Sequence, residues 1–201
     1  MKKLFILSFF VIGIAAYLFW PEIVISYPAG ITAPEQPHQV SINGNNEWQK
    51  DEFNFKALAE YKIKARVLSR NNFSIGKESK ISPVDLALGW GSMSDQSIID
   101  RIKITQRNRW YRWETDYYPI PGNEIIHNSA NVHIIPGNDE VETKLDNIYK
   151  GSLIEMSGYL VEIKTDDGWR WKSSLRRDDT GGGACELFWV ESLVILDDKN
   201  Q

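Results

Sequence analysis

The chain has 201 residues, of which 42% are hydrophobic and 25% are charged. This composition is typical of a globular protein of one or two domains, and it excludes a fully disordered chain or a channel with many membrane spans. With 23 Lys and Arg residues against 27 Asp and Glu residues, the formal net charge is −4, which disfavours nucleic acid as a partner.

Residues 1–22 predict a membrane anchor or a signal segment. Lys2 and Lys3 precede an uncharged apolar run over residues 4–20, whose 17 residues lie at the lower limit for spanning a bilayer. Residues 21–49 contain no Lys or Arg, so the positive-inside rule places the following chain outside the cytoplasm. We therefore expect a single-pass anchor in the inner (cytoplasmic) membrane. The alternative is a cleaved signal that releases a secreted or periplasmic protein.

Residues 23–52 have the composition of a linker or stalk, because proline and glycine are frequent and apolar periodicity is weak. Residues 53–201 are expected to form an extracytoplasmic, β-rich domain. Its first clear strand runs from Tyr61 to Val67, where apolar residues alternate with Lys and Arg.

The middle of the domain predicts a hairpin and a short strand. Residues 79–95 have loop composition, and a short helix is expected to follow, through about Asp100. Residues 102–104 and 110–113 read as two strands joined near Arg107 and Asn108, and residues 132–135 read as a further strand.

One helix is predicted near residues 139–149, because Asn138 is a favourable N-cap and apolar residues recur at helical spacing until Gly151. Three strands follow, over residues 153–164, 169–175 and 186–196. The fold class is therefore α+β, mostly β. A helix between the third and fourth strands is also the order of an OB-type, partly open barrel, which we keep as the finer expectation.

Three phrases resemble an uncharacterised family of bacterial exported or membrane-anchored proteins. They are ALGWGSMSD (Ala87–Asp95), HNSANVHIIP (His127–Pro136) and GYLVEI…DGWRWKSSLRRDDTGGGACELFWVE (Gly158–Glu191). The resemblance covers most of the chain after the linker. It implies a shared fold and a location in the cell envelope, and it supplies no activity.

Aromatic and basic residues gather in the predicted hairpin, and they form the candidate ligand-binding site: Arg107, Arg109, Trp110, Arg112 and Trp113. Trp110 and Arg112 share one strand face, while Tyr111 and Trp113 share the other. Since only one face can be buried, we expect an exposed aromatic beside the arginines, suited to a sugar-rich or anionic ligand. The alternative is a strand face decorated with cation–π contacts. In a second cluster, Trp169 and Trp171 share one face and are expected in the core.

No motif identifies a reaction, so no catalytic residue is assigned. Cys185, the only cysteine, could act as a nucleophile with His133 as its base, but a small buried side chain is the favoured interpretation. The loop Thr180–Gly183 lacks the Lys-Ser/Thr ending of a P-loop. We expect no metal and no cofactor.

The sequence thus favours a non-enzymatic, membrane-anchored envelope protein that binds a partner protein or an envelope polymer. The first alternative is an extracytoplasmic hydrolase or thiol enzyme that uses Cys185 and His133. The second is a single-strand nucleic-acid binder on an OB-like surface.

Overall fold

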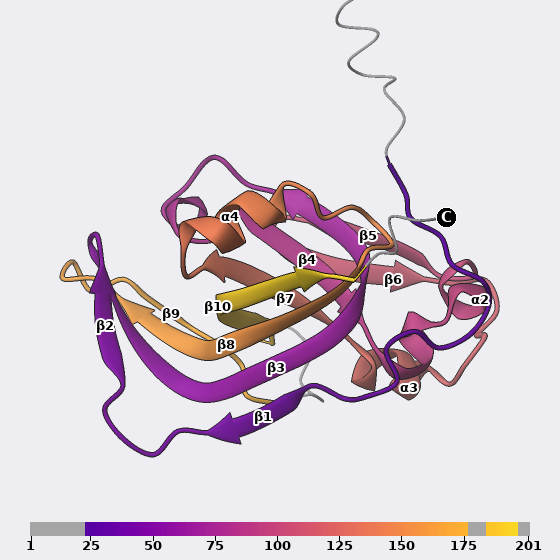
Figure 1. Cartoon of the computed structure of the whole chain (residues 1–201), viewed down its shortest axis with the longest axis horizontal. Coiled ribbons are helices and arrows are strands. Elements are labelled where there is room, and N and C mark those ends of the chain that lie inside the picture. Colours follow the sequence, from indigo (N-terminus) through magenta and orange to yellow (C-terminus); the bar gives the residue numbers. More distant parts are fainter. Residues whose placement is uncertain (1–22, 177–183, 197–201) are drawn as a thin grey trace, which may run out of the picture.

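The computed structural model describes residues 23–176 and 184–196, and this part of the chain is mostly β, as predicted (Figure 1). The expected membrane segment 4–20 and the loop Thr180–Gly183 lie outside the described residues. Among residues 23–176 and 184–196, no helix is long and apolar enough to cross a membrane. The strands are β1 (His38–Ser41), β2 (Glu47–Lys50), β3 (Phe53–Asn72), β4 (Val84–Gly89), β5 (Lys103–Arg107), β6 (Trp110–Glu114), β7 (Ser129–Pro136), β8 (Leu153–Lys164), β9 (Arg170–Lys172) and β10 (Glu186–Ile195). The helices are α2 (Gln96–Ile99), α3 (Gly122–His127) and α4 (Asp139–Leu145), with 3₁₀ turns at Glu78–Lys80 and Gly91–Ser94.

The main sheet returns on itself. β3 pairs with β4, β4 with β7 and β8 with β10, all antiparallel, whereas β7 and β10 pair in parallel. β8 then pairs with β3 again, so these strands form a closed cycle of pairings. The parallel pair brings residues 129–136, from the middle of the chain, beside residues 186–195 near its end.

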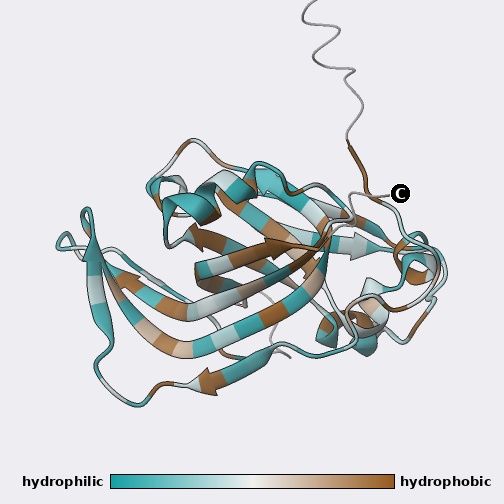
Figure 2. Ribbon diagram, viewed as in Figure 1, coloured by the Kyte–Doolittle hydropathy of each residue, from teal (hydrophilic) through white to brown (hydrophobic). Residues whose placement is uncertain are grey.

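The long strand β3 makes this cycle possible (Figure 1). Hydrophobic and hydrophilic residues alternate along it, as Figure 2 shows, and the hydrophobic ones are buried. It pairs with β8 over residues 54–66 and with β4 over residues 66–72, and its register shifts near Ala57 and near Val67. Such β-bulges bend a strand, which allows β3 to pair with β8 along its first part and with β4 along its last part. The alternation thus predicted the middle of a strand that is 20 residues long.

The core lies inside the cycle, and α4 covers part of it. Tyr61 of β3 meets Phe188 of β10 edge-to-face, with ring centroids 4.9 Å apart. Val141 and Leu145 of α4 are buried in the same cluster, and the Asn138 side chain caps the helix by accepting a hydrogen bond from the Val141 amide at 3.0 Å. This confirms the predicted helix and its cap. Beyond Leu145 the bonds tighten to a 3₁₀ pattern, which ends the α-helix before the predicted residue 149.

Residues 23–52 lie against the domain, where composition predicted a separate stalk. β1 and β2 both pair with β3, Val24 bridges to Lys150, and Ile31 bridges to Asp95. The ring of Tyr27 lies under the guanidinium of buried Arg66, 4.2 Å from its carbon. Backbone hydrogen bonds between strands do not depend on alternating apolar side chains. The proline- and glycine-rich composition of residues 23–52 therefore gave no sign of this pairing.

β5 and β6 form the predicted hairpin, which is a separate two-stranded sheet. Its two turn residues, Asn108 and Arg109, have φ angles of 52° and 62°, as a type I′ turn requires. Asn tolerates this left-handed conformation, whereas Arg adopts it much less often. The inward-facing residues of the hairpin, including Ile104, Tyr111 and Trp113, pack over a buried cluster that contains Leu68, Ala87 and Ile125.

Candidate functional site

A cleft of about 360 Å³ lies beside β6. One wall is formed by Trp110–Glu114 of β6, and the floor includes Ser129–Asn131 of β7. The opposite wall contains Arg176 and the residues 184–186. β7 and β10 pair only from Val132 and Glu186 onward, so the cleft opens where these two strands separate.

Three of the five predicted site residues line this cleft: Trp110, Arg112 and Trp113. Trp110 is 45% exposed, which confirms that one aromatic of the hairpin faces solvent. Trp113 is half-buried and packs edge-to-face on Tyr118. Arg107 is exposed but is not part of the cleft lining.

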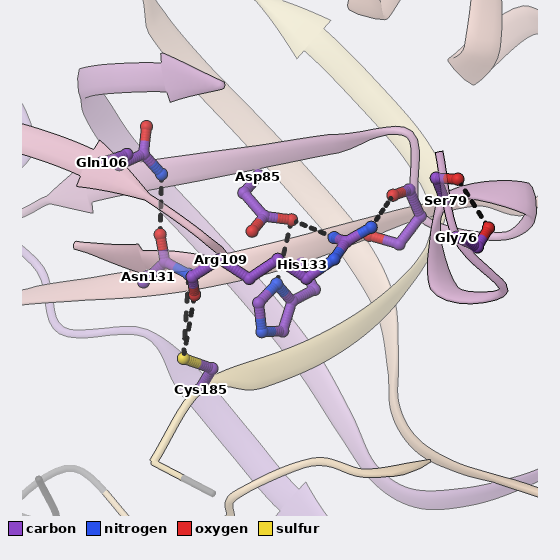
Figure 3. Close-up of polar contacts among 9 residues, drawn as sticks. Gly76, Ser79, Asp85, Gln106, Arg109, Asn131, His133 and Cys185 are labelled. Atoms are coloured by element: carbon purple, nitrogen blue, oxygen red, sulfur yellow. Dashed lines mark hydrogen bonds and ion pairs between the residues drawn. The ribbon is translucent and has the colours of Figure 1, made fainter. Parts of the chain in front are cut away.

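Arg109 corrects the sequence prediction, because its side chain points into the protein (Figure 3). Its Nη1 donates to Asp85 Oδ1 at 2.8 Å and its Nη2 donates to the Ser82 carbonyl at 3.0 Å. The guanidinium also lies over the ring of Phe73, at 4.0 Å from the centroid, and over that of Trp171, at 5.4 Å. Arg109 thus anchors the hairpin and, unlike the predicted residues of β6, does not line the cleft.

His133 completes this buried group. Its Nδ1 lies 2.9 Å from Asp85 Oδ1, although the contact does not meet hydrogen-bond geometry. The imidazole also packs on Trp171, with ring centroids 4.9 Å apart. Trp169 and Trp171, which were expected in the core, are half-buried and pack against a core cluster. The Asp85 carboxylate therefore holds together β4, β7 and the tip of the hairpin.

Three further polar contacts join the hairpin to β7. Gln106 Nε2 donates to Asn131 Oδ1 at 2.7 Å, and the Asn131 Nδ2 group donates to the Arg109 carbonyl at 3.1 Å. The hydroxyls of Tyr111 and Ser129 are 2.6 Å apart. Because Ser129 donates its proton to the Ile125 carbonyl, the Tyr111 hydroxyl is the donor of this pair.

Burial keeps the Tyr111 hydroxyl protonated. Desolvation raises the pKa of Tyr111, and the hydrogen bond to Ser129 acts in the opposite direction. The charge of Glu186 adds a smaller upward contribution to the same pKa. Tyr111 therefore remains a neutral donor at the base of the hairpin.

Cys185 borders the cleft and is partly buried. Asn131 Nδ2 lies 3.7 Å from its sulfur, and the sulfur lies 3.9 Å from the Arg109 carbonyl oxygen. Among the residues that the structure describes, His133 contacts Asp85, and no hydrogen bond joins it to Cys185. The structure thus brings His133 and an aspartate together and does not add the thiol to them.

We expect Cys185→Ala to retain the function of the protein. Removal of a partly buried sulfur should lower the free energy of unfolding by no more than about 1.5 kcal/mol. Complementation of a deletion strain measures function, and urea unfolding of the full chain measures stability. A normally folded Cys185→Ala protein that fails to complement would favour the thiol enzyme.

Several residues of the site carry no motif and were missed at the level of sequence: Asp85, Gln106, Ser129, Asn131, Arg176 and Glu186. One signal was present. Residues 79–95 were expected to form a loop, but residues 84–89 of this stretch form the apolar strand β4. Asp85 is its single charge, and a lone charge in such a strand requires a buried partner. The identity of that partner, 24 residues away, is not encoded nearby.

Within the described residues, no group of three or more His, Cys, Asp or Glu side chains is arranged to hold a metal ion. Comparisons with protein-family models, with curated proteins and with solved structures found no match to this chain.

Proposed function

We propose that this protein is a non-enzymatic binding module of the cell envelope, anchored in the cytoplasmic membrane by residues 4–20, with the domain outside the cytoplasm. Its cleft would bind a partner protein or an envelope polymer. The location rests on the charge asymmetry around the apolar segment, and a cleaved signal remains the alternative. The motifs shared with exported and membrane-anchored proteins support the same location.

The observation that carries the proposed function is the lining of the cleft. Exposed Trp110 and half-buried Trp113 supply flat apolar surface, and exposed Arg112 supplies charge beside them. Among the described residues, no carboxylate lies within ion-pair distance of Arg112. An aromatic surface beside a cation that no described carboxylate neutralises is suited to an external ligand.

We also propose that the domain is an OB-type barrel. The closed cycle β3-β4-β7-β10-β8, the parallel pairing of β7 with β10 and the position of α4 between β7 and β8 support this assignment. OB-type surfaces also bind single strands of nucleic acid, which keeps that function as the second candidate. The carboxylates of Glu114 and Glu186 in the cleft lining and the net charge of −4 disfavour it.

Trp110→Ala should weaken ligand binding by about 5- to 150-fold, because stacking on one aromatic contributes about 1–3 kcal/mol where it has been measured on bases. The full chain in detergent would be titrated with three probes: soluble cell-wall glycan fragments, a linear peptide library and single-stranded DNA. Tyr117→Ala is the matched control, since Tyr117 is 80% exposed and lies outside the cleft lining. An equal loss of affinity in both variants would contradict the proposed function, and so would the absence of binding to all three probes.

A further inference from the structure

The wall of the cleft formed by β6 is a strand edge and not a strand face. All residues from Trp110 to Glu114 line the cleft. Because successive side chains of a strand point to opposite faces, a cleft that lay on one face would be lined by every second residue. A wall that includes five consecutive residues is therefore the edge of β6, where backbone groups are presented.

This edge has no strand partner in the described part of the chain. β6 pairs with β5 alone, in the register that joins Arg107 to Trp110 across the two-residue turn. The pair that closes such a turn is hydrogen-bonded, and bonded and non-bonded pairs alternate along an antiparallel ladder. Tyr111 and Trp113 consequently direct their N–H and C=O groups away from β5, and no backbone hydrogen bond joins them to another described residue.

The floor of the cleft has a similar opening. β7 pairs with β4 along Ser129–Asn131, but it pairs with β10 only from Val132 onward. The cleft is thus bordered by two segments of strand whose cleft-facing sides pair with no other described strand. An occupant that hydrogen-bonds there must offer donors and acceptors at the repeat of two strand residues, about 6.8 Å.

We propose that the occupant of the cleft is an extended segment of a partner polypeptide, which adds as a strand to the edge of β6. This inference rests on the proposed binding function and names its ligand. A polypeptide strand has the required repeat of backbone donors and acceptors, whereas glycans and nucleic acids lack it. β6 offers five residues, or about 14 Å of edge, which matches a short strand.

The side chains that flank this edge indicate which segment is suited to it. Exposed Arg112 has no carboxylate partner among the described residues, while Glu114 at the end of β6 already lies 3.4 Å from Lys103. An acidic side chain opposite Arg112 and an apolar one against Trp110 or Trp113 would complement the wall. The partner segment is therefore extended, carries an acidic and an apolar side chain, and is free of proline at every second position.

The test uses the full chain in detergent micelles and a phage-displayed library of linear eight-residue peptides as the probe. A selected peptide is synthesised with an N-methyl group at each backbone nitrogen in turn. Strand addition predicts that methylation at every second residue weakens binding by about tenfold or more, because each methyl group removes one donor and obstructs the edge. Methylation at the intervening residues should change binding by less than about twofold. Binding should also slow hydrogen exchange at the Tyr111 and Trp113 amides.

A pair of variants tests the protein side of the contact. Trp113→Leu removes the aromatic ring and keeps the N–H, whereas Trp113→Pro removes both. Proline is tolerated where the N–H points away from the sheet, so the hairpin should persist, which urea unfolding checks. The proline variant should bind the peptide about tenfold more weakly than the leucine variant.

Each outcome separates strand addition from the proposed function. Peptides that bind with no alternation in the methylation series would overturn strand addition and leave a binding module. The same conclusion would follow if no peptide were selected while glycan fragments or single-stranded DNA bound in a Trp110-dependent manner. If no probe binds at all, both the strand addition and the proposed function are wrong.

Discussion

Asp85→Ala should lower the free energy of unfolding by about 3–5 kcal/mol, the range found when one partner of a buried ion pair is removed. The Asp85 side chain is 1% exposed and that of Arg109 is 17% exposed, so little water can replace the lost carboxylate. The guanidinium would be left between Phe73 and Trp171, with the Ser82 carbonyl as its remaining hydrogen-bond acceptor. Urea unfolding of the full chain, followed by tryptophan fluorescence, measures the loss.

The double variant Asp85→Ala with Arg109→Ala separates the unpaired charge from the lost packing. Removal of both charges should recover part of the stability lost in Asp85→Ala, because no buried cation then remains without its partner. Ser174→Ala is a control of similar burial, since it removes a buried polar side chain away from this ion pair. A loss below about 1 kcal/mol in Asp85→Ala would show that the ion pair does not anchor the hairpin.

Gly151→Ala should also be strongly destabilising, by about 2–6 kcal/mol. Gly151 has a φ of 90°, a conformation that costs a non-glycine residue about 1–3 kcal/mol. In addition, a Cβ atom at this position would overlap the carbonyl of Ile25, which is backbone and cannot rotate away. Steric overlap of this kind adds about 1–3 kcal/mol or displaces residues 23–27 from the domain.

Gly168→Ala is the matched control for this prediction. Gly168 has nearly the same φ, 87°, but no heavy atom lies within 4 Å of its added Cβ. Its substitution should cost only the backbone contribution, about 1–3 kcal/mol. Equal losses at Gly151 and Gly168, measured by urea unfolding, would contradict the close contact between Ile25 and Gly151 that the structure shows.

The sequence determined the elements whose signals are local. Alternation of apolar and charged residues predicted β3 and the β-rich class, because side chains of a strand alternate between faces. Asn138 and the apolar spacing behind it predicted α4, since an N-cap acts within one helical turn. An exposed aromatic in the hairpin followed from the parity of aromatics in a single strand, and the structure identifies it as Trp110.

Other features depended on residues far apart in the chain, and only the tertiary structure decided them. Arg109 is basic and lies in a turn, yet its side chain is only 17% exposed, because it pairs with the carboxylate of Asp85 on β4. The stretch 23–52 joins the domain through backbone pairing with β3 and Lys150, which its side-chain pattern does not report. The cleft exists because β7 and β10 stop pairing at Val132 and Glu186. Propensity and capping act between neighbours in sequence, whereas ion pairs, strand register and unpaired edges arise from the arrangement of distant segments in space.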